Sequence, residues 1–406
     1  MRKHFDALET RSADARAADL ARVLPAQIAR ALSAPGMAEH IGAVDAADIR
    51  DAAALARLPV LRKSDLGAAQ KLRAPFGGLT TLDPAGFEHI FQSPGPIYEP
   101  GRTTLDWWRV GRFLHACGVG AGDIVQNCFG YHLTPAGMIF ESGARAVGAA
   151  VLPAGTGQTE LQVRAAADVG CTVYAGTPDF LKVILDRADE MGERLVFTRA
   201  AVGGGALFPS LRKEYEARGI ATLQCYATAD IGNIAYESPA MEGMILDEGV
   251  IVEIVRPGTG DPVPEGEVGE VVVTTLNPDY PLIRFATGDL SAVLPGQSPC
   301  GRTNQRIKGW MGRADQTTKI KGMFVRPEQV AALMARHPEA HRARVVASRE
   351  GEMDAMTVQI ETEAQDSARF EASVIATLKL RGKIVLVPPG SLPNDGKVIE
   401  DTRRYD

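Results

Sequence analysis

The segment that decides the fold is Leu195-Val196-Phe197-Thr198-Arg199-Ala200-Ala201-Val202-Gly203-Gly204-Gly205, an apolar run that ends in three glycines. The run has the length and composition of a buried strand, and the glycines are typical of a turn. Similar runs lie at 124–129, 149–152, 171–174 and 222–226, with helical patterns at 135–148, 159–168, 178–190 and 207–218. This alternation predicts an α/β fold with a mainly parallel sheet, whose ligand-binding loops follow the carboxyl ends of the strands.

The rest of the sequence predicts a large N-terminal domain and a small C-terminal one. Apolar residues at three- and four-residue spacing predict an amphipathic helix over 13–33. After the sheet region, strands are separated by Pro- and Gly-rich turns, and strands and helices alternate again from residue 318. We expect a body of residues 1–314, with a helical lead-in (1–100), an α/β sheet region (101–247) and a β-rich part (248–314), and a C-terminal α+β domain of residues 315–406.

Composition narrows the class of partner. The 406 residues include 44 Lys and Arg against 50 Asp and Glu, a formal net charge of −6, and no long basic run. We therefore expect small-molecule partners and no nucleic acid. The lack of a long apolar stretch or signal segment predicts no membrane association and a cytoplasmic location. The five cysteines form no CxxC pair and the seven histidines no HxxxH pair, so any metal is expected to arrive with a substrate.

Five short segments follow one another in the second half of the chain. They are Gly203-Gly204-Gly205-Ala206-Leu207-Phe208-Pro209, Gln224-Cys225-Tyr226-Ala227-Thr228-Ala229-Asp230, Tyr280-Pro281-Leu282-Ile283-Arg284-Phe285-Ala286-Thr287-Gly288-Asp289-Leu290, residues 312–327 beginning Gly312-Arg313-Ala314-Asp315, and Leu392-Pro393-Asn394-Asp395-Gly396-Lys397. Their order and spacing, with Gly155-Thr156-Gly157-Gln158-Thr159-Glu160 before them, resemble the adenylate-forming superfamily and most closely the phenylacetate-coenzyme A ligase family.

This resemblance implies a two-step reaction. A carboxylic acid attacks the α-phosphate of ATP, with Mg²⁺ bound, to give an acyl-adenylate and pyrophosphate; the thiol of coenzyme A then displaces AMP. Because both steps place negative charge on oxygen atoms, positioning and cationic stabilisation are expected to dominate catalysis. The resemblance also implies that the C-terminal domain is a mobile lid, and it leaves a homodimer open.

The resemblance assigns a nucleotide site. Asp289 is expected to accept hydrogen bonds from both ribose hydroxyls, and Arg313 to lie near the ribose. The backbone of Gly204, Gly205 and Ala206 is expected to pass over adenine, and the Tyr226-Ala227-Thr228 segment to flank the base. Taken singly, these residues also fit a turn aspartate, a surface ion pair, a glycine turn that closes the sheet and a core tyrosine.

Catalysis and metal binding are assigned in the same way. Lys397 matches the family's catalytic lysine, which bridges the acid carboxylate and the α-phosphate, although on spacing alone a lysine in such a loop is more often a solvated turn residue. Asp230 stands where the family has a glutamate associated with Mg²⁺. Arg284 matches the family without an assigned role.

The lid is expected to turn about Asp315 between the two half-reactions. On its coenzyme A side the resemblance places Lys319, Lys321 and Gly322, where the glycine would let the backbone approach the pantetheine arm. The two lysines also fit simple exposed charges.

The resemblance places the acid pocket at the end of the first strand, where Phe129, Tyr131 and His132 lie. It favours an aryl or arylacetic acid, and these aromatic residues also fit a core cluster. His132, in place of a small residue, suggests a polar ring substituent as a hypothesis.

The phosphate-binding loop departs from the family, which has a Ser/Thr/Gly-rich loop with a lysine. Residues 91–101, including Ser93, Gly95 and Tyr98, contain three prolines, the acidic Glu99 and no lysine. We favour an active ligase with a modified phosphate grip. Two alternatives remain: a homologue that binds nucleotide or acyl ligand without adenylation, and an adenylating enzyme that transfers to an amine or a carrier-protein thiol.

Overall fold

The computed structural model describes residues 3–314, 316–320, 323–350 and 353–403. The chain divides into two compact units. The first is formed by Met1–Val252, Val273–Phe285 and Leu294–Gly309, and the second by Glu253–Val272, Ala286–Val293 and Trp310–Asp406. Three stretches of the expected β-rich part, 253–272, 286–293 and 310–314, thus belong to the second unit, and the domain boundary after residue 314 stays a prediction.

A nine-stranded sheet is the main element of the first unit, in the order β14-β15-β10-β9-β8-β7-β6-β4-β5. Its parallel strands are β4 (Ile124–Asn127), β5 (Ala150–Leu152), β6 (Val173–Gly176), β7 (Arg199–Val202) and β8 (Ala221–Thr228). Antiparallel pairing then adds β9 (Gly232–Tyr236), β10 (Met244–Leu246) and β15 (Arg306–Ile307), and β14 (Val293–Leu294) lies at the edge.

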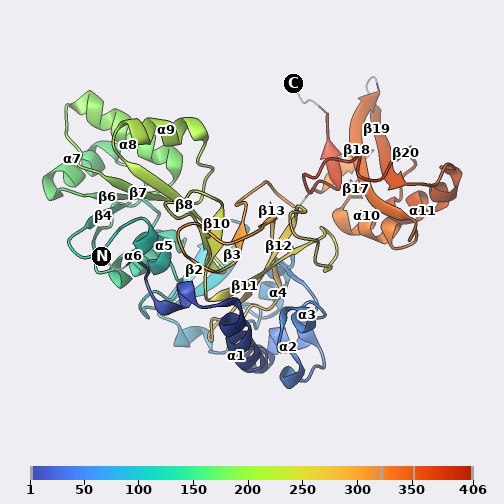
Figure 1. The fold of residues 1–406 in the computed structure, drawn as a ribbon, viewed down its shortest axis with the longest axis horizontal. Helices are drawn as coiled ribbons and strands as arrows, with labels where there is room; N and C mark the ends of the chain where they lie inside the picture. Colours follow the sequence, from blue (N-terminus) through green and yellow to red (C-terminus); the bar gives the residue numbers. More distant parts are fainter. Residues whose placement is uncertain (1–2, 315, 321–322, 351–352, 404–406) are drawn as a thin grey trace. The chain divides into compact units, whose positions relative to one another are not determined.

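Successive residues of the parallel strands point to opposite faces, and a different set of helices covers each face (Figure 1). Val173 and Ala201 pack with α5 (Gly111–Ala116) and α6 (Ala136–Ala146). Tyr174, Ala200 and Val202 pack with α7 (Thr159–Val169), α8 (Pro178–Met191) and α9 (Pro209–Ala217). Helices on both faces of a largely parallel sheet confirm the predicted α/β fold class.

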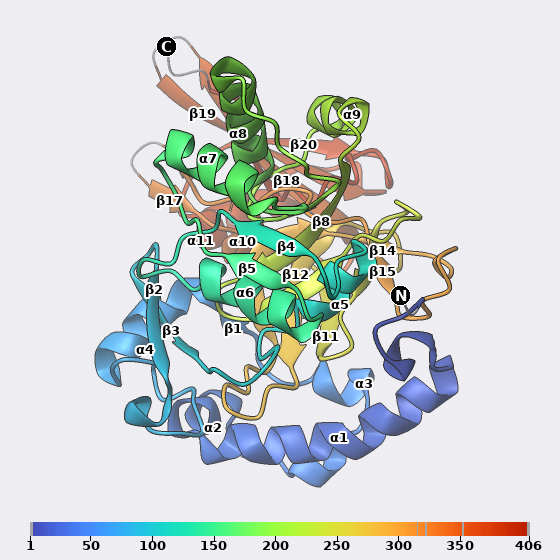
Figure 2. The same ribbon diagram turned by 90° about the vertical axis from the view of Figure 1, so that its left-hand side faces the viewer.

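The N-terminal region is helical as expected. The longest helix, α1 (Ala13–Ser33), coincides with the predicted range, is capped by the Ser12 side chain and buries Leu24, Ile28 and Ala31. It packs beside α2 (Pro35–Ile41), as Figure 2 shows. Short elements complete the region: η1 (Ala7–Thr10), η2 (Ala46–Asp48), α3 (Ala52–Leu55), β1 (Leu61–Arg62), η3 (Lys63–Asp65), α4 (Leu66–Leu72) and η4 (Pro84–Gly86).

The divergent phosphate segment folds as a hairpin. Strands β2 (His89–Ser93) and β3 (Ile97–Gly101) pair antiparallel from His89↔Gly101 to Ser93↔Ile97. Gln70 of α4 fixes β3 from the side, since its amide group donates to the Tyr98 carbonyl at 2.8 Å and accepts from the Tyr98 N–H at 2.9 Å. This segment therefore has a defined backbone path.

A four-stranded sheet, β1-β13-β12-β11, contributes residues to both units through β11 (Val250–Val255), β12 (Gly269–Thr275) and β13 (Phe285–Ser291). The second unit also contains the hairpin β16 (Thr318–Ile320) and β17 (Met323–Val325) and a sheet in the order β20-β19-β18-β21. That sheet comprises β18 (Ala340–Glu350), β19 (Met353–Thr362), β20 (Lys383–Val387) and β21 (Ile399–Asp401). Its core includes residues of α10 (Pro327–Met334) and α11 (Ala368–Leu378).

Within the described residues, no helix has the length and apolar character needed to cross a bilayer.

A buried ion pair predicts a large stability effect. Glu9 is 1% exposed, accepts a hydrogen bond from the Tyr236 hydroxyl at 2.7 Å and pairs with the buried Arg302. Glu9→Ala leaves the Arg302 charge without its carboxylate, so we expect the free energy of unfolding, measured in urea, to fall by about 3 kcal/mol or more. The exposed Glu193→Ala is the control, expected to change it by about 0.5 kcal/mol or less. Equal effects of the two substitutions would contradict this account.

Candidate functional site

The glycine turn lies beside the end of β4. Gly204 has a φ of +69°, and a Cβ added there would lie 3.7 Å from Cε1 of Phe129 and 3.9 Å from Cγ2 of Thr177. Gly204, Gly205 and Ala206 are exposed, so their backbone is open to a ligand. The structure thus brings the predicted adenine-binding turn next to one predicted acid-pocket residue.

The strand after this turn carries the second nucleotide segment. Tyr226 is buried on β8, and Ala227 and Thr228 are half-buried at its end. The Thr228 hydroxyl accepts a hydrogen bond from the Ile231 N–H at 3.2 Å, which closes the turn containing Asp230. Asp230 therefore has a fixed place at the end of the sheet.

The three acid-pocket residues differ in environment. Phe129 is buried and stacks on Phe140 with ring centroids 4.2 Å apart. Tyr131 is half-buried, its hydroxyl accepts from Nδ2 of Asn127 at 2.8 Å, and burial raises the pKa of Tyr131. His132 is exposed. Of the three, His132 is the side chain most accessible to an incoming ligand.

The hairpin is bonded to this region. The Gln92 N–H donates to the Leu133 carbonyl at 2.8 Å, and the Gln92 side chain donates to the Tyr98 hydroxyl at 2.9 Å. Ser93 points inward and donates to the buried carboxyl of Glu99. Ser93 and Tyr98 therefore make contacts within the hairpin, while Gly95 lies in its turn.

Glu99 and Asp230 belong to one buried charged group. The Glu99 side chain is fully buried, and this burial, followed by the nearby Asp230 charge, raises the pKa of Glu99 to about 7. Asp230 is 4% exposed, and its Oδ2 lies 2.6 Å from Nζ of Lys63. Burial raises the pKa of the Tyr280 hydroxyl, and the charges of Asp230 and Glu99 raise it further. Lys63 thus places a positive charge near residues 91–101, which contain no lysine.

Arg284 holds the backbone that carries Lys63. This arginine is 1% exposed, has a φ of +47°, and donates through Nη1 to the carbonyls of Ala56 and Leu58. Its own carbonyl accepts from the Leu61 N–H at 3.0 Å. These bonds give a structural role to a residue that the sequence left without one.

The predicted ribose-binding residues meet in the second unit. Arg313 and Asp289 form a β-bridge, and Nη1 of Arg313 lies 2.9 Å from Oδ1 of Asp289. Nε1 of Trp310 donates to the same oxygen at 3.1 Å. Gly288, which precedes Asp289, has a φ of +76°, and a Cβ there would lie 2.8 Å from Nη2 of Arg313. Two residues 24 positions apart in the sequence thus form one polar pair.

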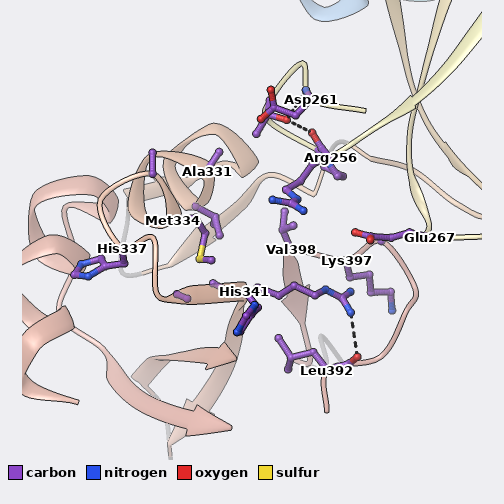
Figure 3. Close-up of a pocket in the computed structure, with 18 of the residues that line it drawn as sticks. Arg256, Asp261, Glu267, Ala331, Met334, His337, His341, Leu392, Lys397 and Val398 are labelled. Atoms are coloured by element: carbon purple, nitrogen blue, oxygen red, sulfur yellow. Dashed lines mark hydrogen bonds between the residues drawn. The ribbon is translucent and has the colours of Figure 1, made fainter. Parts of the chain in front are cut away.

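Lys397 is exposed on a loop whose backbone is fixed. Arg344 donates to the Lys397 carbonyl at 3.1 Å and pairs with Asp395, and Oε1 of Gln316 accepts from the N–H groups of Val398 and Ile399. The loop borders a cavity of about 250 Å³ within the second unit. In Figure 3, Lys397 and Glu267 lie on the same side of this cavity. A fixed backbone with a long, exposed side chain suits a lysine that must reach a ligand.

Of the four remaining candidates in the predicted lid, one lies among the described residues. Lys319 lies on β16, where it pairs with Phe324 of β17. Asp315, Lys321 and Gly322 lie outside the described residues. Their proposed roles stay predictions.

The Asp230 region fits a magnesium ion. Mg²⁺ prefers oxygen ligands and is commonly held by one or two carboxylates together with substrate phosphates. Oδ1 of Asp230 is buried and has no hydrogen-bond partner among the described residues. Searched over the same residues, the structure contains no cluster of three or more His, Cys, Asp or Glu side chains arranged for a metal. A magnesium ion here would therefore need other oxygen ligands, such as those of a nucleotide.

Comparison with known proteins identifies the family. No family model matches the chain. It is 31% identical over 335 residues to the phenylacetate-coenzyme A ligase of Thermus thermophilus, covering 78% of this chain and 74% of the relative. The phenylacetate-coenzyme A ligase of Aromatoleum evansii is 30% identical over 331 residues, covering 77% and 73%. The chain belongs to the phenylacetate-coenzyme A ligase family.

Solved structures share the fold of this family member. An open conformation of 2-hydroxyisobutyryl-CoA ligase, in complex with 2-HIB-AMP and CoA, matches with a TM-score of 0.72 at 22% identity, over 95% of this chain and 91% of that one. The same ligase in the postadenylation state also matches with a TM-score of 0.72, at 24% identity over 98% of this chain and 91% of that one. At these identities the similarity supports the fold alone.

Sequence reasoning did not indicate that Lys63 and Tyr280 belong to this region, or that Glu99 is buried near Asp230. Lys63 lies 167 residues before Asp230, in a short polar stretch that reads as a helix start. The sequence offered one indication of Lys63, which was electrostatic. Acidic residues such as Glu99 and Asp230, placed near a predicted polyanion site, need a positive charge from elsewhere in the chain.

The Asp289–Arg313 pair predicts nucleotide affinity. Asp289→Asn removes a charged acceptor, and a hydrogen bond to a charged group contributes about 1.5–3 kcal/mol, so AMP should bind about 10- to 100-fold more weakly. Calorimetric titration with AMP measures this effect. Asp366→Asn, an exposed substitution in the same unit, is the control and should leave AMP affinity unchanged. Equal AMP affinity in the two variants would exclude Asp289 from the nucleotide site.

Proposed function

We propose that the protein is an ATP-dependent ligase that joins a carboxylic acid to coenzyme A through an acyl-adenylate. The observation that carries this proposal is the 31% identity over 335 residues with a phenylacetate-coenzyme A ligase. The Asp289–Arg313 pair supports it, because a carboxylate beside a guanidinium can bind a ribose diol and the oxygens around it.

In the first half-reaction, the acid carboxylate attacks the α-phosphate and pyrophosphate leaves. Lys397 is proposed to bridge the two reacting anions, and its exposed side chain on a fixed backbone supports that role. Lys63 is proposed to supply positive charge that residues 91–101 lack, since its ammonium lies beside Asp230. Magnesium held through Asp230 would neutralise charge on the phosphate oxygens.

In the second half-reaction, the thiol of coenzyme A attacks the acyl carbonyl and AMP leaves. Rotation about Asp315, with Lys319, Lys321 and Gly322 facing coenzyme A, belongs to this proposal.

The acid is proposed to be aryl or arylacetic. Phe129 offers an apolar ring beside the glycine turn, and Tyr131 and His132 follow it on the same loop. The exposed imidazole of His132 can form a hydrogen bond to a polar ring substituent.

One observation favours a second candidate, a protein that binds nucleotide without adenylation. The fully buried Glu99 lies near Asp230, and proline occupies positions 94, 96 and 100 of the hairpin, so this segment offers fewer backbone donors and more negative charge to a triphosphate.

Acid-dependent pyrophosphate release separates these candidates. The assay should include phenylacetate, ring-hydroxylated phenylacetates, benzoate and 2-hydroxyisobutyrate, each with and without coenzyme A. The proposed function requires release with at least one acid and formation of its thioester. Tight AMP binding without release would favour the second candidate. Release that coenzyme A does not accelerate would indicate transfer to an amine or a carrier-protein thiol.

The lysine loop gives a direct test of mechanism. Lys397→Ala should lower acid-dependent pyrophosphate release at least about 100-fold, because removing one preorganised charge from a transition state commonly costs about 2.7–4 kcal/mol. ATP affinity and thermal unfolding should change little. Lys383→Ala, at another exposed lysine of the second unit, is the control and should keep full activity. Normal pyrophosphate release in Lys397→Ala would remove this lysine from the mechanism.

Acid selectivity should depend on His132. In His132→Gly, we expect the kcat/KM ratio of hydroxylated to unsubstituted phenylacetate to fall about fivefold, since one hydrogen bond contributes about 1 kcal/mol. The ratio cancels effects on nucleotide binding and protein concentration. An unchanged ratio would show that His132 does not select the acid.

A further inference from the structure

Trp310 presents a large apolar ring at the surface of the second unit. The residue is 53% exposed, yet its ring is held in place, because Nε1 donates to Oδ1 of Asp289 at 3.1 Å. Exposing an indole to water is unfavourable, and a hydrogen bond to a carboxylate restricts the orientation of the ring. An exposed ring with a restricted orientation is the arrangement expected of a residue that packs against a ligand.

The backbone holds Trp310 against the end of β13. The N–H of Met311 donates to the Leu290 carbonyl, and the N–H of Leu290 donates to the Gly312 carbonyl, each at 2.9 Å. Gly309 and Gly312 have φ angles of +94° and +122°, which residues with a Cβ rarely adopt. The position of the indole thus depends on a turn with one glycine on each side of Trp310 and Met311.

Two exposed donors share one oxygen of the ribose-binding candidate. Nη1 of Arg313 lies 2.9 Å from Oδ1 of Asp289, the oxygen that Trp310 also contacts. The Arg313 side chain is 55% exposed, whereas that of Asp289 is 11% exposed. Because both donors act on the same oxygen, they set the direction in which the carboxylate accepts further hydrogen bonds. An acceptor, a cation and an apolar ring together match a sugar that carries hydroxyl groups and a phosphate.

We propose that Trp310 belongs to the nucleotide site: its indole N–H positions the Asp289 carboxylate for the ribose hydroxyls, and its exposed ring packs against the sugar. The first role acts through Asp289, so it concerns only ligands that carry ribose hydroxyls. The second role depends on the ring alone and concerns deoxygenated sugars as well. The inference rests on the nucleotide binding of the proposed function and adds to it a positioning residue.

Calorimetric titration of the full-length protein with AMP and with 2′,3′-dideoxy-AMP separates the two roles. Trp310→Phe keeps an aromatic ring and removes the donor, so the affinity for AMP should fall about fivefold and that for dideoxy-AMP should change little. Trp310→Ala also removes the ring and should lower both affinities. Ile375→Ala, at another exposed apolar side chain of the second unit, is the control and should bind both nucleotides as the unaltered protein does.

Three results would overturn the proposal. They are the absence of AMP binding in the unaltered protein, equal losses for the two nucleotides in Trp310→Phe, and unchanged affinities in both Trp310 variants. A general structural disturbance would give equal losses, so the difference between the nucleotides is the decisive readout.

A double substitution tests whether Trp310 acts through Asp289. Asp289→Ala leaves no carboxylate to position, so adding Trp310→Phe should lower AMP affinity by less than about twofold, because the two residues act as one unit. A further fivefold loss in the double variant would contradict the positioning role.

Fluorescence reports directly on the ring. The chain contains three tryptophans, and Trp107 and Trp108 lie in the first unit. Saturating AMP should change the tryptophan emission of the unaltered protein and of Ile375→Ala, and it should leave that of Trp310→Phe nearly unchanged. An equal change in Trp310→Phe would exclude contact between this ring and the ligand.

Acid-dependent pyrophosphate release distinguishes this inference from the proposed function. The expected affinity pattern without pyrophosphate release would keep the role of Trp310 and exclude the ligase function. Pyrophosphate release by the unaltered protein, together with equal AMP affinity in Trp310→Phe, would do the reverse.

Discussion

The ion pair between Lys63 and Asp230 connects the N-terminal lead-in with the end of the central sheet, across 167 residues of sequence. Asp230 is almost fully buried beside a second buried carboxyl group, Glu99, and a low-dielectric region does not tolerate two negative charges without compensation. The position of Lys63 is fixed in turn by Arg284, whose guanidinium and carbonyl both bond the backbone at 56–61. The first hundred residues therefore contribute a charged side chain to the candidate site.

The regular parts of the fold were predictable because burial on both faces of a parallel strand leaves a continuous apolar run. The runs at 124–129 and 222–226 correspond to β4 and β8, and the helix at 13–33 has the predicted ends. The run at 195–202 gave a strand only over Arg199–Val202, where β6 and β8 provide partners on both sides. Apolar composition marks what is buried, while pairing decides where a strand begins.

The site was predictable where residues close in sequence act together. The glycine turn follows its strand directly, so its exposure at the sheet end follows from local sequence. Lys63, Glu99 and Tyr280 come from three distant segments, and no local pattern indicates that they share one buried region. The acidic residue of the hairpin therefore looked like an isolated departure from the family, whereas in the structure Ser93 donates to its carboxyl group and the charge of Asp230 raises its pKa.

Residues 89–101 form a paired hairpin held by Gln70 and bonded to the loop at Leu133. A glycine-rich loop that wraps phosphates must give up backbone freedom when its ligand arrives, whereas a hairpin containing three prolines has already lost most of that freedom during folding. For a nucleotide bound as proposed, less ordering entropy would then oppose binding at this segment. Discrimination between triphosphate and monophosphate would accordingly depend on the balance of fixed charges, and ionic strength should influence it more than temperature does.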